Sequence, residues 1–238
     1  MTYIDGFVLA VPAANKDAYI TMASDGSPLF HEFGCTRHVE AWGDDVPHGK
    51  LTDFYRAVKA TEDEVIVFSW IEYPDKETRD AASQKMMSDP RMAEMGANMP
   101  FDGSRMIYAG FNPIVDQGGE TKGGYIDGIL LAVPNEKRDA YQALATKTAG
   151  IFREFGALRV LEGWGDDVPD GKVTDYKGAV QATAEETVVF SWLEWSDKDM
   201  RNAGWAKLME DERMKAELPM PFDGQRMMWG GFASVFDK

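Results

Sequence analysis

The chain has 238 residues, of which 44% are hydrophobic, so it can bury a substantial core without disulfides or metal. Its formal net charge of −15 is spread along the chain without a basic block, which argues against nucleic acid and against an anionic membrane surface as partners. A single cysteine, the lack of a leader-like N-terminus and the lack of any stretch of membrane-spanning length predict a cytoplasmic protein.

The first half of the chain predicts alternating strands and helices. Residues 4–11 form a short apolar run that ends at Pro12, which is typical of a buried strand. Residues 13–33 have helical spacing, interrupted at Gly26 and Pro28, and Gly34 stands where helices commonly end in a left-handed residue. The other expected elements are a strand at 39–42, a turn-rich loop at 44–53, a hairpin of strands 54–60 and 65–73, a helix at 75–87, a short helix restarting at 89–90 and a last strand at 105–111.

The second half repeats this order, because the same short segments return along the chain. Residues 3–6 (YIDG) recur at 125–128, residues 42–47 (WGDDVP) at 164–169, residues 67–70 (VFSW) at 189–192 and, after one deletion near Pro219, residues 99–103 (MPFDG) at 220–224. The order β-α-β, hairpin, α-β, found twice, predicts an α+β fold of two ferredoxin-like repeats with antiparallel sheets. The expected division is residues 1–117, a glycine-rich linker at 118–124 and residues 125–238.

Strand positions of both parities are largely apolar, so both faces of each sheet are expected to be buried. In the strand at 65–73, Phe68 and Trp70 lie on one face, and Val67 and Ile71 lie on the other. Helices can cover one face, and the two sheets can cover each other's second face. A linker of this length spans roughly 25 Å at most, which is enough to run along the rim of such a barrel. We therefore expect the two repeats to pair face to face within the chain; a higher homo-oligomer is left open.

With the strands placed, several segments resemble the YbaA-like proteins, a family of small bacterial proteins of unassigned function (domain-of-unknown-function family 1428). These segments are residues 5–8, 42–47, 67–73, 85–92 and 99–108, and the resemblance covers essentially all of both copies. It implies the dimeric α+β barrel superfamily, whose single-copy members pair their sheets across a two-fold axis. The chain would then be a tandem, gene-duplicated version of such a dimer.

The resemblance also implies where a ligand would lie. Superfamily relatives include cofactor-independent oxygenases, haem-handling enzymes and lactone isomerases, with the ligand held between sheet and helices. The second copy departs from the first mainly near its second helix, where Glu212 replaces Pro90 and Trp205 stands opposite Ser83. The two pockets are therefore not expected to be fully equivalent.

Glutamate and tryptophan alternate on two strands of each copy, and residues two apart point to the same face of a strand. If these faces meet the helices, each copy has a cavity with aromatic walls and carboxylates of raised pKa, suited to acid–base chemistry. The candidate catalytic residues are Glu40, Glu162, Glu72 and Glu194, and the candidate ligand-binding residues are Trp42, Trp164, Trp70 and Trp192. A structural interpretation competes with this one: the glutamates lie at strand ends, paired with Arg37 and Arg159 or with Arg105 and Arg226, and the tryptophans belong to the core.

A metal site is the weaker interpretation of the histidines. His31, Cys35 and His38 lie close together, but the second copy has Arg153, Ala157 and Val160 at these positions, and His48 faces Asp170. Surface or helix-end histidines and a small buried cysteine are expected instead, with no metal and no cofactor.

Three functions remain open at this point. The first is binding of a small organic molecule in a sheet–helix pocket, with metal-free acid–base or oxygenase-type chemistry. The second is ligand binding without turnover. The third is a structural or protein-interaction barrel without a ligand.

Overall fold

The computed structural model describes residues 2–119, 122–215 and 220–238. Repeat one consists of strands β1 (Tyr3–Pro12), β2 (Arg37–Asp45), β3 (Glu64–Tyr73) and β4 (Ile107–Gly118) and helices α1 (Lys16–Glu32), α2 (Phe54–Ala57), α3 (Lys76–Ser88) and α4 (Pro90–Ala97). Repeat two consists of strands β5 (Tyr125–Pro134), β6 (Arg159–Asp167), β7 (Glu186–Trp195) and β8 (Met228–Asp237) and helices α5 (Arg138–Glu154), α6 (Tyr176–Ala179), α7 (Lys198–Glu210) and α8 (Glu212–Lys215). Short 3-10 turns occupy Ala13–Asn15, Gly103–Arg105 and Asn135–Lys137.

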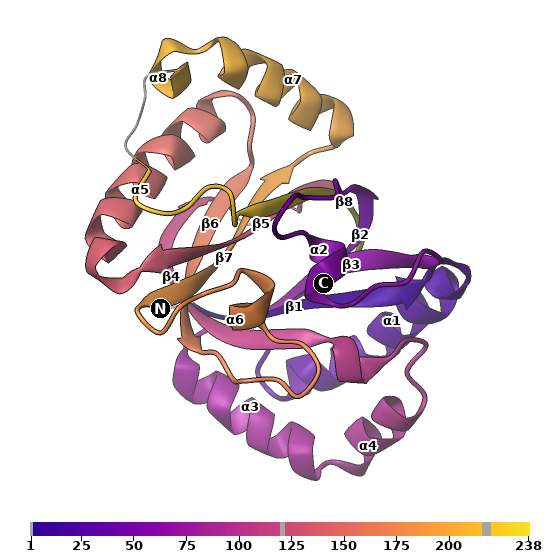
Figure 1. The fold of residues 1–238 in the computed structure, drawn as a ribbon. Helices are drawn as coiled ribbons and strands as arrows, with labels where there is room; N and C mark the ends of the chain where they lie inside the picture. The colour runs from indigo at the N-terminus through magenta and orange to yellow at the C-terminus, as the bar shows by residue number, and fades with distance from the viewer. Residues whose placement is uncertain (1, 120–121, 216–219) are drawn as a thin grey trace.

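The strands of both repeats close into one antiparallel barrel in the order β1-β3-β2-β8-β5-β7-β6-β4 (Figure 1). Each repeat contributes a four-stranded sheet, and the seams between the sheets are the pairs β2–β8 and β4–β6. The expected α+β fold, with two ferredoxin-like repeats paired as an intrachain dimeric α+β barrel, is confirmed. The pairing has a simple cause, because closure leaves no sheet edge and covers both apolar faces.

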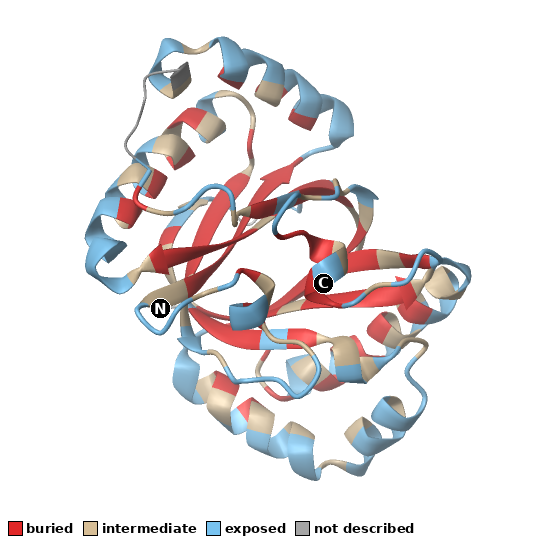
Figure 2. Cartoon of the chain, viewed as in Figure 1, coloured by how far each residue is buried: buried red, intermediate tan, exposed pale blue. Residues whose placement is uncertain are grey.

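Side chains fill the barrel interior in layers along its axis. Phe68 of β3 stacks on Phe190 of β7 at 4.4 Å between ring centroids, and Trp70 stacks on Trp192 at 4.3 Å. The longer helices lie outside the barrel, with α1, α3 and α4 on one side and α5 and α7 on the other (Figure 1). Figure 2 shows the consequence, since the strands are buried along most of their length while the outer faces of these helices are exposed.

The strand expected at residues 54–60 is wrong, and so is the hairpin that it was to form. Residues 54–57 form the short helix α2, because the Asp53 side chain accepts a hydrogen bond from the backbone N–H of Arg56 and begins a helical turn. Phe54 and Val58 are apolar because they are buried with the interior cluster of the barrel. Strand β3 pairs with β1 and β2 instead.

Two other boundaries differ from expectation for tertiary reasons. Strand β4 continues past Phe111 to Gly118, because its second half pairs with β6 of the other repeat. Helix α1 continues through Gly26 and Pro28 without interruption. A Cβ at Gly26 would lie 2.4 Å from the Cε of Met95, so glycine here permits close packing against α4. Of the expected linker, Glu120 and Thr121 lie outside the described residues.

The expected starts of the two helices near residues 75 and 90 are confirmed. Asp75 and Asp89 cap α3 and α4 by accepting backbone hydrogen bonds from Thr78 and Arg91. Gly34 has a φ of 108° and ends α1 in the left-handed region, as expected. Among the described residues, no helix combines the length and the apolarity that crossing a membrane requires.

Candidate functional site

A cavity of about 210 Å³ lies between the outer face of the repeat-one sheet and helices α1, α3 and α4; we call it the repeat-one cavity. Its wall is mostly thioether and aromatic, and flexible methionines suit a pocket of irregular shape. An apolar cavity of about 150 Å³ is enough to hold benzene, so this one can hold a small organic molecule. The apolar lining includes Met22, Met86, Met92, Met95, Met99, Met106, Phe7, Phe30 and Phe101.

Glu40 is the centre of a hydrogen-bonded group on the sheet wall of this cavity. Its neighbours Val39 and Ala41 belong to the barrel interior, so strand alternation turns Glu40 toward the helices. The Glu40 carboxylate accepts a hydrogen bond of 2.5 Å from the Tyr19 hydroxyl and lies 2.7 Å from Nε2 of His38. Burial, and then the charge of Glu40, raise the pKa of Tyr19 well above its usual value, so the phenol keeps its proton.

His38 is buried beside Glu40 and lines the same cavity. Its ring lies 5.1 Å from the ring of Phe30 and 5.1 Å from that of Phe236, so an aromatic side chain of β8 in repeat two packs against it. Because Nε2 faces the carboxylate, the hydrogen-bond network assigns the proton to Nε2. Nδ1 then carries a free lone pair, and it has no hydrogen-bond partner among the described residues.

Asp5 is a second acidic group in the lining of the cavity. Its Oδ1 accepts a hydrogen bond of 2.7 Å from Nε of Arg79, whose Nη1 also pairs with Asp167 of repeat two at 2.7 Å. Burial raises the pKa of Asp5 to about 6, against the opposing effect of Arg79. Tyr73 also lines the cavity, and its buried hydroxyl has no hydrogen-bond partner among the described residues.

Repeat two keeps the tyrosine–glutamate pair of this site but not the histidine. The hydroxyl of Tyr141 donates to Glu162 at 2.6 Å, as Tyr19 does to Glu40. Burial raises the pKa of Glu162 to about 7. Val160 stands in the position of His38, so Glu162 has no imidazole beside it on this strand.

In repeat two, the counterpart of Asp5 is Asp127, and three side chains donate hydrogen bonds to it. Asp127 accepts hydrogen bonds from Nε1 of Trp195 at 2.9 Å and Nε1 of Trp205 at 2.8 Å, both on Oδ2, and from Nε of Arg201 at 2.8 Å on Oδ1. Repeat one has Tyr73 and Ser83 at the two tryptophan positions. The two repeats therefore differ in the donors that surround this aspartate.

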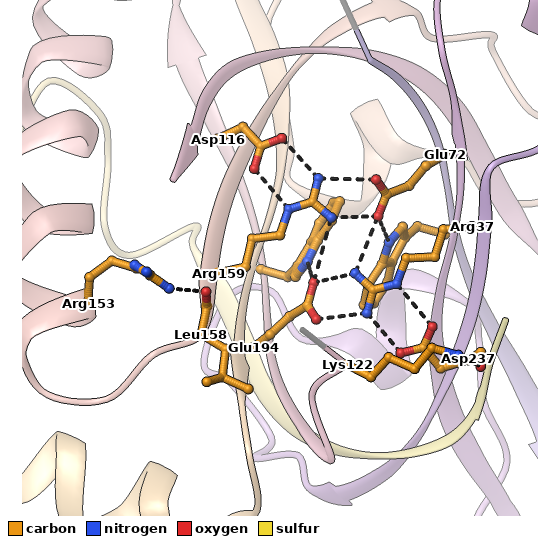
Figure 3. A network of polar contacts seen from close by, with 11 residues as sticks. Arg37, Glu72, Asp116, Lys122, Arg153, Leu158, Arg159, Glu194 and Asp237 are labelled. Carbon is orange, nitrogen blue, oxygen red and sulfur yellow. Dashed lines mark hydrogen bonds and ion pairs between the residues drawn. The ribbon is translucent and has the colours of Figure 1, made fainter. Parts of the chain in front are cut away.

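The second pair of candidate glutamates lies inside the barrel, away from the repeat-one cavity (Figure 3). Glu72 accepts from Nε1 of Trp70 at 3.0 Å and pairs with Arg159 of the other repeat at 2.7 Å. Glu194 repeats this arrangement, because it accepts from Trp192 at 3.0 Å and pairs with Arg37 at 2.8 Å. Asp116 and Asp237 occupy the remaining donors of Arg159 and Arg37.

This placement corrects the expectation of one cavity per repeat with two glutamates and two tryptophans. On β2, Glu40 and Trp42 face the helices; on β3, Trp70 and Glu72 face the barrel interior. Glutamate and tryptophan alternate in the same way on both strands. These side chains face the helices on β2 but the barrel interior on β3, because the two strands present different positions to the helices. For Glu72 and Glu194, the competing interpretation of pairing with Arg159 and Arg37 describes the contacts. Arg105 and Arg226 instead pair with Glu64 and Glu186.

Trp42 and Trp164 lie on the helix side without lining the repeat-one cavity. Trp42 packs beside Tyr19 at 6.2 Å, and Trp164 packs beside Tyr141 at 6.5 Å. Each tryptophan therefore packs against the tyrosine of the tyrosine–glutamate pair in its own repeat. A direct role in ligand binding stays a prediction for them, as it does for Trp70 and Trp192.

His31, Cys35 and His38, which were considered as metal ligands, do not form a ligand cluster in the described residues. Nδ1 of His31 bonds to the backbone oxygen of Cys35 at 2.8 Å, and His48 is an exposed side chain beside Tyr55. Burial raises the pKa of Cys35 to about 12, which leaves it a neutral thiol near pH 7. Among the described residues, no three histidine, cysteine or acidic side chains are grouped as metal ligands would be.

Sequence reasoning missed Tyr19, Asp5, Tyr73 and the role of His38. The expectation of a surface or helix-end position is wrong for His38, which is buried in β2. His38 was not selected from the sequence because the second copy has Val160 at this position. That selection assumed that a functional site would be present in both copies. The alternation of His38 with Glu40 was a usable signal, since the two side chains had to share a face.

A model of the family described as "Protein of unknown function (DUF1428)" matches residues 2–103 and 124–224 of the chain. The uncharacterized protein YbaA of Escherichia coli (strain K12) is 67% identical over 117 residues, which are 49% of this chain and 100% of YbaA.

Solved structures of other proteins resemble this chain over its full length. A monooxygenase-like protein of Fusobacterium nucleatum subsp. nucleatum aligns with a TM-score of 0.59 at 10% identity, covering 100% of this chain and 94% of the other. An anthrone oxidase-like protein aligns with a TM-score of 0.55 at 9% identity, covering 100% and 92%. At such low identity, these two comparisons show a shared fold.

Proposed function

The chain belongs to the DUF1428 family, with two copies of the family's repeat, and from this premise we propose that it binds a small, largely apolar molecule in the repeat-one cavity and moves a proton on it without a metal. One observation carries the proposal. A buried imidazole, held at Nε2 by a carboxylate and without a partner at Nδ1, lines an apolar cavity of molecular size.

His38 is the proposed general base. Glu40 orients the ring and stabilises the imidazolium that forms when Nδ1 takes a proton, which is the role of a carboxylate behind a catalytic histidine. Tyr19 donates to Glu40 and keeps the carboxylate turned toward His38. The lining around these residues is mostly apolar, and low local polarity strengthens such hydrogen bonds.

The names of the two fold neighbours suggest oxygenase-type chemistry, in which a deprotonated substrate would react with oxygen. Their identity of 9–10% supports the fold only, so the proposal stops at the proton-transfer step. Oxygen uptake during turnover is the measurement that would extend it.

Proton transfer can be tested without knowing the substrate. The chain is incubated in D2O with a panel of neutral weak carbon acids, and exchange of their C–H protons is followed by NMR. We expect catalysed exchange with at least one panel member, and a loss of about 10²–10⁴-fold in His38→Gln, because that is the usual contribution of general-base catalysis. Glu162→Gln in repeat two is the matched control and should keep the wild-type rate.

Each other outcome supports a different function. Exchange that survives both His38→Gln and Glu40→Gln removes these residues from the chemistry. Panel molecules that bind in the cavity without any exchange indicate a binding module. A protein that neither binds nor exchanges any of them supports the structural barrel.

A further inference from the structure

Repeat two contains an aromatic side chain in the space that corresponds to the repeat-one cavity. The indole of Trp205 donates its N–H to Oδ2 of Asp127 at 2.8 Å, and its ring meets Phe152 edge to face at 5.4 Å between centroids. Asp5 and Phe30 are the counterparts of Asp127 and Phe152, and both line the repeat-one cavity. The position of the Trp205 indole is therefore the position of the cavity.

Repeat one lacks the side chains that satisfy this aspartate in repeat two. Ser83 replaces Trp205, and Tyr73 replaces Trp195, so neither indole N–H is present. Within the described residues, Arg79 bonds to Oδ1 of Asp5, and Oδ2 has no hydrogen-bond donor. The hydroxyl of Tyr73 also has no partner there. Oδ2 of Asp5 is therefore an acceptor in the cavity wall that is available to a ligand, and a hydrogen bond to a carboxylate is stronger than one between neutral groups.

We propose that the ligand of the repeat-one cavity is a neutral, planar aromatic molecule with one N–H or O–H donor, bound where repeat two places its own indole. The donor bonds to Oδ2 of Asp5, and the ring packs against the edge of Phe30. This inference rests on the proposed function of the cavity as a ligand site and names the class of molecule that it takes.

The remaining lining agrees with this class. Thioether sulfur makes favourable contacts with aromatic rings, and Met22, Met86 and Met95 lie in the wall. The carboxylates of Asp5 and Glu40 disfavour an anionic ligand in a buried site. A ring without a donor would fill the volume but leave Asp5 unpaired, so the donor provides specificity.

Indole is the direct probe, and 1-methylindole is its control because it has nearly the same shape but no N–H. Titration calorimetry on the intact chain should give one indole site. We expect 1-methylindole to bind about 10-fold or more weakly, as for the loss of a hydrogen bond to a buried acidic group. Equal affinity for the two probes would overturn the proposed contact with Asp5.

The duplication supplies matched variants. Ser83→Trp places the repeat-two indole in repeat one and should abolish indole binding, while Trp205→Ser should open a second site and change the stoichiometry from one to two. Asp5→Asn should weaken binding about 10-fold, and Asp127→Asn should leave the affinity unchanged. Thermal melts identify variants that fail to fold, and in that case Ser83→Phe replaces Ser83→Trp as the blocking variant.

Failure of this inference can be separated from failure of the proposed function. If Ser83→Trp folds and still binds indole like the wild type, the cavity does not correspond to the Trp205 position and the inference is wrong. If carbon acids without a ring donor are exchanged by His38 while indole does not bind, the ligand class is wrong but the proposed function stands. If neither probe binds and no exchange occurs, both are wrong.

Discussion

The two sheet–helix spaces of this molecule share a framework and differ in their contents. Both keep a tyrosine hydroxyl on a buried glutamate, at 2.5 Å in repeat one and 2.6 Å in repeat two. In repeat one, this pair is joined to His38 at the wall of an apolar cavity. In repeat two, valine replaces the histidine, and two indoles converge on the aspartate. Duplication within one chain allows one copy to keep a cavity while the other fills the same space with side chains that stabilise the fold.

The largest effect is expected from removing repeat two altogether. Residues 1–117 alone expose the edges of β2 and β4 and the apolar interior face of the sheet, so they should associate as a homodimer. Sedimentation at micromolar concentration tests this. Such a dimer carries two copies of the repeat-one cavity and should bind two indole molecules. A stable monomer without exposed apolar surface would contradict the role of the seams.

The next effect is expected at residue 195, where a tryptophan of repeat two stands opposite Tyr73 of repeat one. Trp195 is fully buried, so Trp195→Ala should lower the free energy of unfolding by about 3–5 kcal/mol, as for other large-to-small core changes. In repeat one, Tyr73→Phe removes only a hydroxyl without a partner and should change that energy by less than about 1 kcal/mol. Urea unfolding measures both. A loss from Tyr73→Phe as large as that from Trp195→Ala would show that the Tyr73 hydroxyl does have a hydrogen-bond partner.

A pH dependence should arise from Glu162. Its folded-state pKa of about 7 is above the usual 4.5, so its contribution to stability is fully present below pH 4.5 and is lost as the pH rises through 7. The loss amounts to about 3 kcal/mol at most. Glu162→Gln stays neutral and can still accept from Tyr141, so this part of the pH dependence should vanish in urea unfolding from pH 4.5 to 8. An unchanged profile would exclude Glu162 as its source.

The smallest predicted effect concerns a feature that the repeats share. Gly34 and Gly156 end the first helix of each repeat with φ of 108° and 109°, so alanine at either position should cost about 1–2 kcal/mol. A Cβ at Gly34 would lie 2.6 Å from Cγ2 of Thr78, against 3.3 Å from Cε of Met200 at Gly156. Thermal melts should therefore rank Gly34→Ala as the more damaging change. The reverse order would show that local crowding does not decide the cost.

Much of the fold was predictable because its signals are local. The caps at Asp75 and Asp89 and the glycine at residue 34 follow from side-chain and backbone chemistry within a few residues. The segment at residues 54–60 was not predictable in this way. Its apolar residues face the barrel interior from a helical turn, and only closure of the barrel creates that interior.

The candidate site was predictable in part. Glu40 was identified and does line the cavity, whereas Glu72 shows the same alternation with tryptophan but belongs to an ion network between repeats. Periodicity states which residues share a face and not which face meets the helices, because both faces are apolar here. The comparison of the two copies set His38 aside, since it treated a difference between the copies as a lack of function.

By itself, the sequence determined the duplication, the order of most strands and helices, and the pairing of two sheets in one barrel. These follow from repeated segments, periodicity and the need to cover two apolar faces. Only the tertiary structure decided that His38, Glu40, Asp5 and Tyr73 share one cavity and that Trp205 fills its counterpart. The physical reason is that a cavity is volume left between packed side chains of several elements, and no local pattern records what stays unfilled.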